Sequence, residues 1–254
     1  MSERIEYCLE PFVEALKSFG MNPNRAQIRM FIQYYEMLIK WNQSVNLTAI
    51  TEFDEVMLKH FIDSASFGIL KEPTAGKKLI DVGTGAGFPG IPLKILFPEL
   101  DVTLIDSLQK RITFLNAVIE QLGLNEIKAL HLRAEEAGHQ PEYRESFDYC
   151  VSRAVANLAV LSEYCIPFVK VGGLFVSYKA ADCSKELDEA GTALSHLSAE
   201  ISNTKDVLLQ YKAEQIKRRL VVIRKTAPTQ EKYPRKAGIP AKRQSSPNLC
   251  VNYL

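Results

Sequence analysis

One glycine-rich turn constrains the fold of this chain more than any other feature. A short apolar run containing a single acid, Asp81, is typical of a buried strand, and Gly83, Gly85 and Gly87 follow it before a helical pattern begins. Glycines suit a sharp turn because they adopt positive φ values and let a ligand approach the backbone without a Cβ in the way. A strand, a glycine turn and a helix in this order predict the start of a nucleotide-binding βαβ unit.

Asp106 indicates which nucleotide such a unit would bind. It ends the next strand-like run, roughly 20 residues beyond the glycines, where an acid hydrogen-bonds the ribose hydroxyls of an adenosine. Asp81 and Asp106 together favour S-adenosylmethionine (AdoMet), whose cationic sulfonium and ammonium groups tolerate carboxylates, over a dinucleotide, whose pyrophosphate favours a bare helix N-terminus. A nicotinamide dinucleotide stays open as an alternative because residues 85–90 also match Gly-x-Gly-x-x-Gly, and so does a glycine turn that binds nothing.

Strands and helices alternate from residue 77 onward, which predicts a parallel sheet covered on both faces. The strands expected are 78–82, 101–106, 127–132, 147–152, 174–179, 205–211 and 219–224. The last two have too few residues between them for a helix, so they should form an antiparallel hairpin. The expected fold class is therefore α/β, with the seven-stranded, mostly parallel sheet of a class I (Rossmann-like) AdoMet-dependent methyltransferase.

Three regions differ in pattern and charge. We expect a helical N-terminal extension (1–72), a methyltransferase domain (73–226) and a basic, extended and loosely held C-terminal tail (227–254). Residues 212–243 hold eleven Lys or Arg and two Glu, a net charge of +9 in a chain whose total is +1. Such a block predicts an anionic partner, RNA or DNA first, and a solvated tail without a ligand is the alternative.

The composition argues against a membrane, secreted or metal-binding protein. Hydrophobic residues make up 46% and charged residues 24% of 254 positions, as in ordinary globular proteins. No uncharged apolar stretch of roughly 18 residues occurs, so we expect no membrane span, and the N-terminus lacks the apolar segment of a secretory signal. The cysteines are scattered without metal-ligand spacing. We therefore expect a cytoplasmic protein that holds no metal.

Several further segments occur in an order that one family shares. They are 41–48, 60–64, 106–111, 133–135, 152–155 and 233–238. Together with the glycine turn, this ordered set resembles the bacterial methyltransferases that modify a guanine N7 in 16S ribosomal RNA, the glucose-inhibited division protein B family. The resemblance runs from about residue 31 to residue 243.

The resemblance implies a cofactor site built mainly on the first loop. Gly83 and Phe88 would line the AdoMet site, Gly85 and Gly87 would provide backbone clearance, and Asp106 would hold the ribose. The other cofactor-binding residues implied are Ala134 and Glu135, beside the adenine, and Arg153, near the methionine end or the incoming base. The basic residues expected to contact RNA phosphate or base are Lys179, Arg235 and Lys236.

The reaction implied is transfer of a methyl group from AdoMet to N7 of a specific guanine in 16S (small-subunit) ribosomal RNA. Because N7 has a lone pair and no proton, its attack needs no general base, and we expect no catalytic side chain of that kind. The partner would be 16S ribosomal RNA or the small ribosomal subunit, and the protein a monomer. Two alternatives stay open: a small-molecule or protein methyltransferase of the same fold, and a ribosome-assembly protein with a vestigial pocket.

Two segments of the N-terminal region have an ordinary structural interpretation. Asn42 and Asn46 would satisfy the free carbonyls at a helix end, and the alternative is that they and Trp41 face an RNA base. Lys59 and Asp63 are four residues apart in the expected helix 51–65, so we expect a surface ion pair between them.

Overall fold

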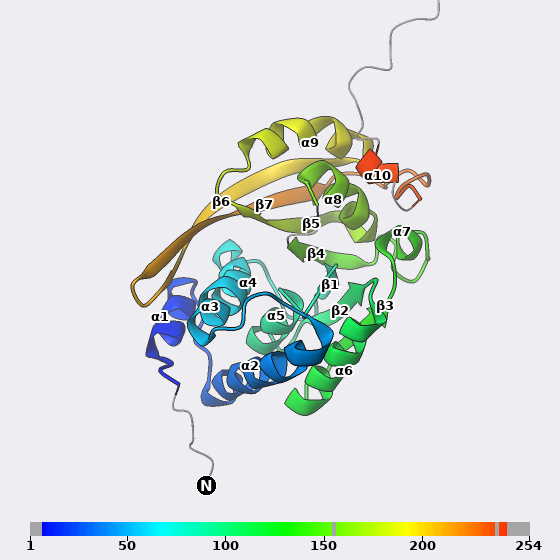
Figure 1. Ribbon diagram of the computed structural model, residues 1–254. Helices are drawn as coiled ribbons and strands as arrows, with labels where there is room; N and C mark the ends of the chain where they lie inside the picture. The colour runs from blue at the N-terminus through cyan, green and yellow to red at the C-terminus, as the bar shows by residue number, and fades with distance from the viewer. Residues whose placement is uncertain (1–6, 154–155, 237–238, 243–254) are drawn as a thin grey trace, which may run out of the picture.

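The computed structural model describes residues 7–153, 156–236 and 239–242 (Figure 1). A seven-stranded sheet runs through the molecule in the order β3-β2-β1-β4-β5-β7-β6. Its strands are β1 (Lys78–Val82), β2 (Asp101–Asp106), β3 (Ile127–His131), β4 (Phe147–Arg153), β5 (Val169–Ala180), β6 (Ala199–Tyr211) and β7 (Glu214–Lys225). The first five strands pair in parallel, and β7 runs antiparallel to both β5 and β6. The fold class expected from the sequence is confirmed.

The hairpin of β6 and β7 is longer than the sequence indicates. Its strands pair from Ala199 opposite Lys225 to Tyr211 opposite Glu214. The first half of β6, as far as Asp206, carries mostly exposed side chains and so lacks the apolar alternation by which a strand is recognised. Backbone pairing with β7 holds this half in the sheet, and the far end of the hairpin reaches α1 (Figure 1).

Helices cover both faces of the sheet, each over its own apolar core (Figure 1). On one face lie α1 (Glu10–Ser18), α2 (Arg25–Val45), α3 (Phe53–Val56), α4 (Asp63–Ala65), α5 (Gly90–Leu96) and α6 (Gln109–Leu122), and on the other α7 (Ala134–Ala137), α8 (Leu158–Cys165) and α9 (Ser184–His196). Successive residues of the central strand β1 divide between the two cores, Leu79 in the first and Ile80 in the second. The N-terminal helices therefore form one layer of the domain.

The expected third helix, 51–65, is not one continuous α-helix. Between α3 and α4 lies a π-helical segment, η1 (Met57–Ile62), whose wider i→i+5 turn rotates the residues that follow it. Lys59 consequently pairs with Glu55, and Asp63 is turned inward with only 3% of its surface exposed. The expected surface pair between Lys59 and Asp63 is wrong.

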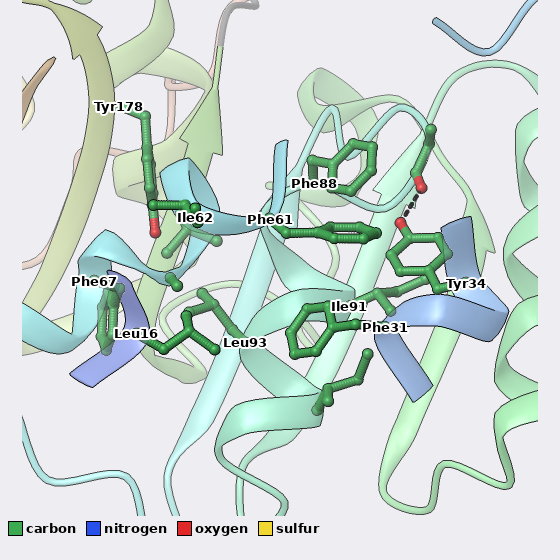
Figure 2. Packing of buried hydrophobic residues seen from close by; sticks show 14 of the residues in the cluster. Leu16, Phe31, Tyr34, Phe61, Ile62, Phe67, Phe88, Ile91, Leu93 and Tyr178 are labelled. Carbon is green, nitrogen blue, oxygen red and sulfur yellow. Dashed lines mark hydrogen bonds between the residues drawn. The ribbon is translucent and has the colours of Figure 1, made fainter. Parts of the chain in front are cut away.

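Tyr34 of α2 joins the N-terminal layer to the glycine turn. Its hydroxyl donates a hydrogen bond to the carbonyl of Ala86, in the middle of the turn (Figure 2). The ring lies 5.3 Å from that of Phe61 and 5.4 Å from that of Phe88, between centroids. The N-terminal layer thus packs against the glycine turn and holds it through Tyr34.

Residues 227–236 pack against the domain, whereas the sequence predicts a loosely held tail. The Arg144 guanidinium donates to the carbonyl oxygens of Thr229 at 2.7 Å and of Gly138 and Tyr233 at 2.8 Å. The Tyr233 side chain is itself buried in the second core. This part of the tail belongs to the folded domain.

The remaining short segments are η2 (Ser66–Leu70), η3 (Ile166–Phe168) and α10 (Ile239–Lys242). Parts of the expected N-terminal extension (1–6) and C-terminal tail (237–238, 243–254) lie outside the described residues, as do positions 154–155 of one family-like segment. Within the described part of the chain, no helix has the length and apolar character needed to cross a membrane.

Candidate active site

A cavity of about 420 Å³ opens at the carboxyl ends of β1, β2 and β4. Parallel sheets bind ligands at this edge, at the point where the strand order reverses direction. In this sheet the order reverses at β1, which lies between β2 and β4. The structure brings five predicted site residues together in its lining: Gly83, Gly85, Phe88, Asp106 and Arg153.

The glycine turn is fixed by Asp81. Its Oδ2 accepts hydrogen bonds from the Thr84 hydroxyl at 2.7 Å and from the backbone N–H of Gly90 at 2.8 Å. Gly83 and Gly85 have φ values of +71° and +62°, which favour glycine. A Cβ at Gly85 would meet no atom within 4 Å, so open space lies against the loop. The turn therefore fits a ligand that packs directly on its backbone.

Asp106 stands at the cavity wall with its carboxylate engaged. Its Oδ2 accepts from the N–H of Gly85 and from Nη1 of Arg111, each at 3.0 Å, and Oδ1 accepts from the N–H of Leu108 at 2.9 Å. Arg111 also lines the cavity, and 31% of its side chain is exposed, so it has room to move aside. An acid held by backbone donors and one displaceable cation fits the predicted ribose contact.

His60, Phe88 and Arg153 form a stacked layer in the wall of the cavity. The rings of His60 and Phe88 are 4.5 Å apart between centroids with 19° between their planes, and the Arg153 guanidinium lies 5.2 Å from the Phe88 centroid. Nη2 of Arg153 is 3.1 Å from Nδ1 of His60, and Nε2 of His60 is 3.0 Å from Oγ1 of Thr48. Nδ1 also lies 3.2 Å from the carbonyl oxygen of Lys59, which could only accept a proton, but the contact with Arg153 is shorter and arginine only donates, so we place the ring proton on Nε2.

Two buried groups of this site have opposite effects on the pH dependence of stability. Burial, reinforced by Arg153, lowers the pKa of His60 from 6.5 to about 3, so its share of the stability is lost as pH falls through that range. Burial raises the pKa of Asp81 from 3.8 to about 7, so its share is lost as pH rises between those values. Between pH 3.8 and pH 6.5 the two groups therefore change the free energy of unfolding in opposite directions.

Replacing His60 with glutamine should leave the effect of Asp81 unopposed. Relative to wild type, the free energy of unfolding of His60→Gln is expected to rise by up to about 1.4 kcal/mol for each unit that the pH is lowered from 6.5 toward 4. Urea unfolding of both proteins at several pH values across this window measures the difference. A difference that does not vary with pH would contradict the prediction.

Three predicted cofactor residues lie outside the described lining of the cavity. Gly87 has a φ of +99°, and a Cβ there would come within 2.5 Å of the Tyr34 hydroxyl. Glycine at this position therefore serves the packing beneath the loop. Ala134 and Glu135 begin α7, and their predicted place beside an adenine ring stays a prediction.

Part of the cavity lining was not predicted from the sequence. The lining residues not predicted are Leu47, Thr48, His60, Thr84, Ala86, Ser107 and Arg111. Asn42 shapes the segment containing the first two, because its Oδ1 accepts from the N–H groups of Leu47 at 2.6 Å and Thr48 at 2.9 Å. The sequence predicts that Asn42 satisfies free carbonyls at the helix end, whereas its side chain bonds backbone groups of the turn after the helix, and that turn is also a wall of the cavity. All of the lining residues not predicted, except Thr84 and Ala86, lie in the family-like segments 41–48, 60–64 and 106–111, which were the available signal.

The predicted RNA contacts differ in their availability. Lys179 is 2.6 Å from Glu186 and donates to the carbonyl of Ala156 at 2.9 Å, and 9% of its side chain is exposed. Arg235 pairs with Glu163, whereas the side chain of Lys236 is exposed. Of these three residues, only Lys236 is exposed and directly accessible to a phosphate.

Replacing Arg235 with alanine is expected to cost stability. Its guanidinium bonds both oxygens of Glu163, Nη2 to Oε2 at 2.6 Å and Nε to Oε1 at 2.9 Å, and that carboxylate is only 5% exposed. Leaving it without this partner should lower the free energy of unfolding by about 2 kcal/mol. The matched control Lys236→Ala should change it by less than about 0.5 kcal/mol. Urea unfolding measures both, and equal values would contradict this account.

The sheet order, the glycine turn after β1 and the acid at the end of β2 define a class I AdoMet-dependent methyltransferase. The family model described as GidB, rRNA small subunit methyltransferase G, matches residues 27–220. The chain belongs to this family.

Curated relatives resemble the chain over most of its length. The Ribosomal RNA small subunit methyltransferase G of Acetivibrio thermocellus is 50% identical over 91% of this chain and 93% of its own. The protein of the same name from an Exiguobacterium species is also 50% identical, over 91% of this chain and 96% of its own. A solved structure from Pyrococcus horikoshii matches with a TM-score of 0.52 at 12% identity, covering 69% of this chain and 64% of that one, which shows the fold alone.

Proposed function

We propose that this protein transfers the methyl group of AdoMet to N7 of a specific guanine in 16S (small-subunit) ribosomal RNA. The proposal depends on the relatives named Ribosomal RNA small subunit methyltransferase G, which share half of their residues with this chain over nine tenths of its length. The cavity at the switch point of the sheet, between the glycine turn and Arg153, supports it independently.

The residues of the first cavity suit the parts of AdoMet. When bound, the cofactor supplies an electrophilic methyl group on a sulfonium. Asp106 would accept hydrogen bonds from the ribose hydroxyls in place of the one from Arg111, while Gly83 and Gly85 would lie against the ligand. Ala134 and Glu135 would flank the adenine.

The site suits a reaction that requires no general base. His60 is neutral, and both of its ring nitrogens are engaged, one by Arg153 and one by Thr48. N7 of guanine attacks with its own lone pair and loses no proton. The protein therefore has to position N7 in line with the methyl group and the sulfur. Holding the reactants in line can lower the barrier by up to about 7–11 kcal/mol. Arg153 is well placed for this because it donates to the carbonyl of Lys59 at 3.0 Å and joins β4 to η1.

The partner would be 16S ribosomal RNA or the small ribosomal subunit, met in the cytoplasm by a monomer. The proposed organisation is a helical N-terminal extension (1–72), the methyltransferase domain (73–226) and a basic tail (227–254) whose first part, 227–236, packs against that domain. Lys236 is exposed and available to a phosphate, whereas Lys179 and Arg235 would first have to exchange their carboxylate partners for RNA.

Methyl transfer to defined ribosomal material tests the proposal. Small subunits from cells lacking the protein should accept label from methyl-labelled AdoMet at one guanine, recovered as 7-methylguanosine in the 16S RNA. Subunits from cells that contain the protein are the matched control and should accept almost none. Label in a ribosomal protein or in large-subunit RNA, or no label with active protein, would reject the proposed substrate.

A further inference from the structure

A second cavity, of about 370 Å³, shares a wall with the first. His60 and Arg153 line both cavities, and Asp63, Tyr178 and Arg218 are among the residues that line only the second. Two cavities divided by one pair of side chains suit a reaction in which a donor and an acceptor molecule must meet. Apart from the two shared residues, Lys179 is the one described lining residue of this cavity with a proposed role, as an RNA contact.

Asp63 presents an unused acceptor in this cavity. The side chain is 5% exposed, and its Oδ2 accepts from Nη1 of Arg153 at 2.9 Å. Within the described residues its Oδ1 is buried and has no hydrogen-bond partner, because Nε of Arg218, at 3.6 Å, is beyond hydrogen-bonding distance. A buried carboxylate oxygen without a donor is costly, so its retention in a cavity points to a ligand that donates hydrogen bonds.

We propose that the second cavity binds the acceptor base and that Asp63 recognises guanine through its N1–H and N2–H groups. The inference builds on the proposed function. Guanine presents these two donors side by side on the edge opposite N7, whereas adenine has an acceptor at N1. A carboxylate therefore selects guanine and leaves N7 free to face the first cavity past His60 and Arg153.

The contact also strengthens during the reaction. N7 forms its bond to the methyl carbon with its lone pair, the sulfur–carbon bond breaks with its electrons staying on sulfur, and no proton is released. The ring becomes cationic, which makes N1–H and N2–H stronger donors. A carboxylate bonded to them thus binds the transition state more tightly than the ground state.

Arg218 covers the entrance to this acceptor. Its position on β7 puts its Nε beside Oδ1 of Asp63, and 28% of its side chain is exposed. The incoming base would take its place, and the freed guanidinium would turn outward to an RNA phosphate. Lys59 and Lys179 also line the cavity, so the competing occupant is a phosphate itself.

A substrate that lacks one donor tests the contact. Inosine keeps N7, O6 and N1–H of guanosine but has no exocyclic amine, and it replaces the mapped target guanosine in otherwise identical 16S RNA. For the wild-type protein, kcat/KM is expected to fall about 10- to 100-fold with inosine, the loss of one hydrogen bond to a charged group. In Asp63→Asn the amide oxygen must face Arg153, so its NH2 faces the cavity and repels the donors of guanine.

Asp63→Asn should therefore be slow on guanosine and show almost no further loss on inosine. Asp148→Asn is the matched control: this carboxylate pairs with Lys77 at 3.2 Å and Lys170 at 3.3 Å at the other end of β4, and the inosine effect should persist there. Thermal unfolding checks that each variant is folded, and the wild-type comparison needs no variant.

Three results would overturn the inference. The first is equal methylation of guanosine and inosine by the wild-type protein. The second is the same inosine effect in wild type and Asp63→Asn. The third is tighter RNA binding by Asp63→Asn with an unchanged inosine effect, which would assign the cavity to a phosphate. Failure of the wild-type protein to methylate guanosine at all rejects the proposed function instead, so the two failures are distinguishable.

Discussion

Gly87→Ala is expected to lower the free energy of unfolding by about 3 kcal/mol, from positive-φ strain together with overpacking. The added Cβ would lie 2.5 Å from the Tyr34 hydroxyl and 2.7 Å from Cδ1 of Ile91, and the φ of +99° is unfavourable for alanine. Tyr34 cannot withdraw easily, because its side chain is fully buried and its hydroxyl is bonded to Ala86 (Figure 2). Urea unfolding measures the loss.

Gly85→Ala is the matched control, two positions away in the same loop. Its φ is also positive, but the new Cβ would meet no atom within 4 Å, so the loss of stability should be only about 1 kcal/mol. The methyl group would instead occupy space in the cavity, and the affinity for AdoMet should fall at least about 10-fold through overpacking against the ligand. Calorimetric titration with AdoMet measures this. Similar losses of stability in both variants would contradict the conclusion that Gly87 is required for packing against Tyr34 and Gly85 for space beside the ligand.

Arg153→Ala is expected to lower the free energy of unfolding by about 3 kcal/mol and to abolish most methyl transfer. The side chain, 14% exposed, bonds Asp63, His60 and the carbonyl of Lys59, so its loss leaves the buried Asp63 carboxylate without its closest cation. The wall between the two cavities would also open.

The double variant Asp63→Ala/Arg153→Ala separates the two effects. Removing both charges should recover about 1–2 kcal/mol relative to the sum of the single losses, because neither charge is then buried alone. Methyl transfer should not recover, since both cavities have lost a wall residue. Strictly additive stability losses would show that the ion pair contributes nothing.

The sequence predicts the central part of this molecule well because its signals there are local. The glycine turn, Asp81 and Asp106 follow from strand and turn chemistry over a short span, and the structure places Gly83, Gly85 and Asp106 at one cavity. The antiparallel ending follows from the short connection between the last two strands. Each of these features is determined by residues that are close together in the sequence.

The features that the sequence analysis missed depend on distant partners. A π turn in η1 cannot be recognised from helical periodicity, so the pairing of Asp63 with Arg153, 90 positions away, replaces the expected one with Lys59. Arg235 and Lys236 are alike in sequence, and only the position of Glu163 on α8 distinguishes a structural arginine from an exposed lysine. The composition of the tail could not reveal that Arg144 holds it.

The reach of the β6–β7 hairpin to the N-terminal layer has a consequence for synthesis on the ribosome. The Tyr211 hydroxyl lies 3.5 Å from the carbonyl of Cys8 and 3.3 Å from Asp54, which also pairs with Lys212 at 2.6 Å. The N-terminal helices therefore form their last contacts only after the hairpin, 203 positions further along the chain, has emerged. Truncation within the hairpin should therefore leave the N-terminal layer exposed to proteolysis.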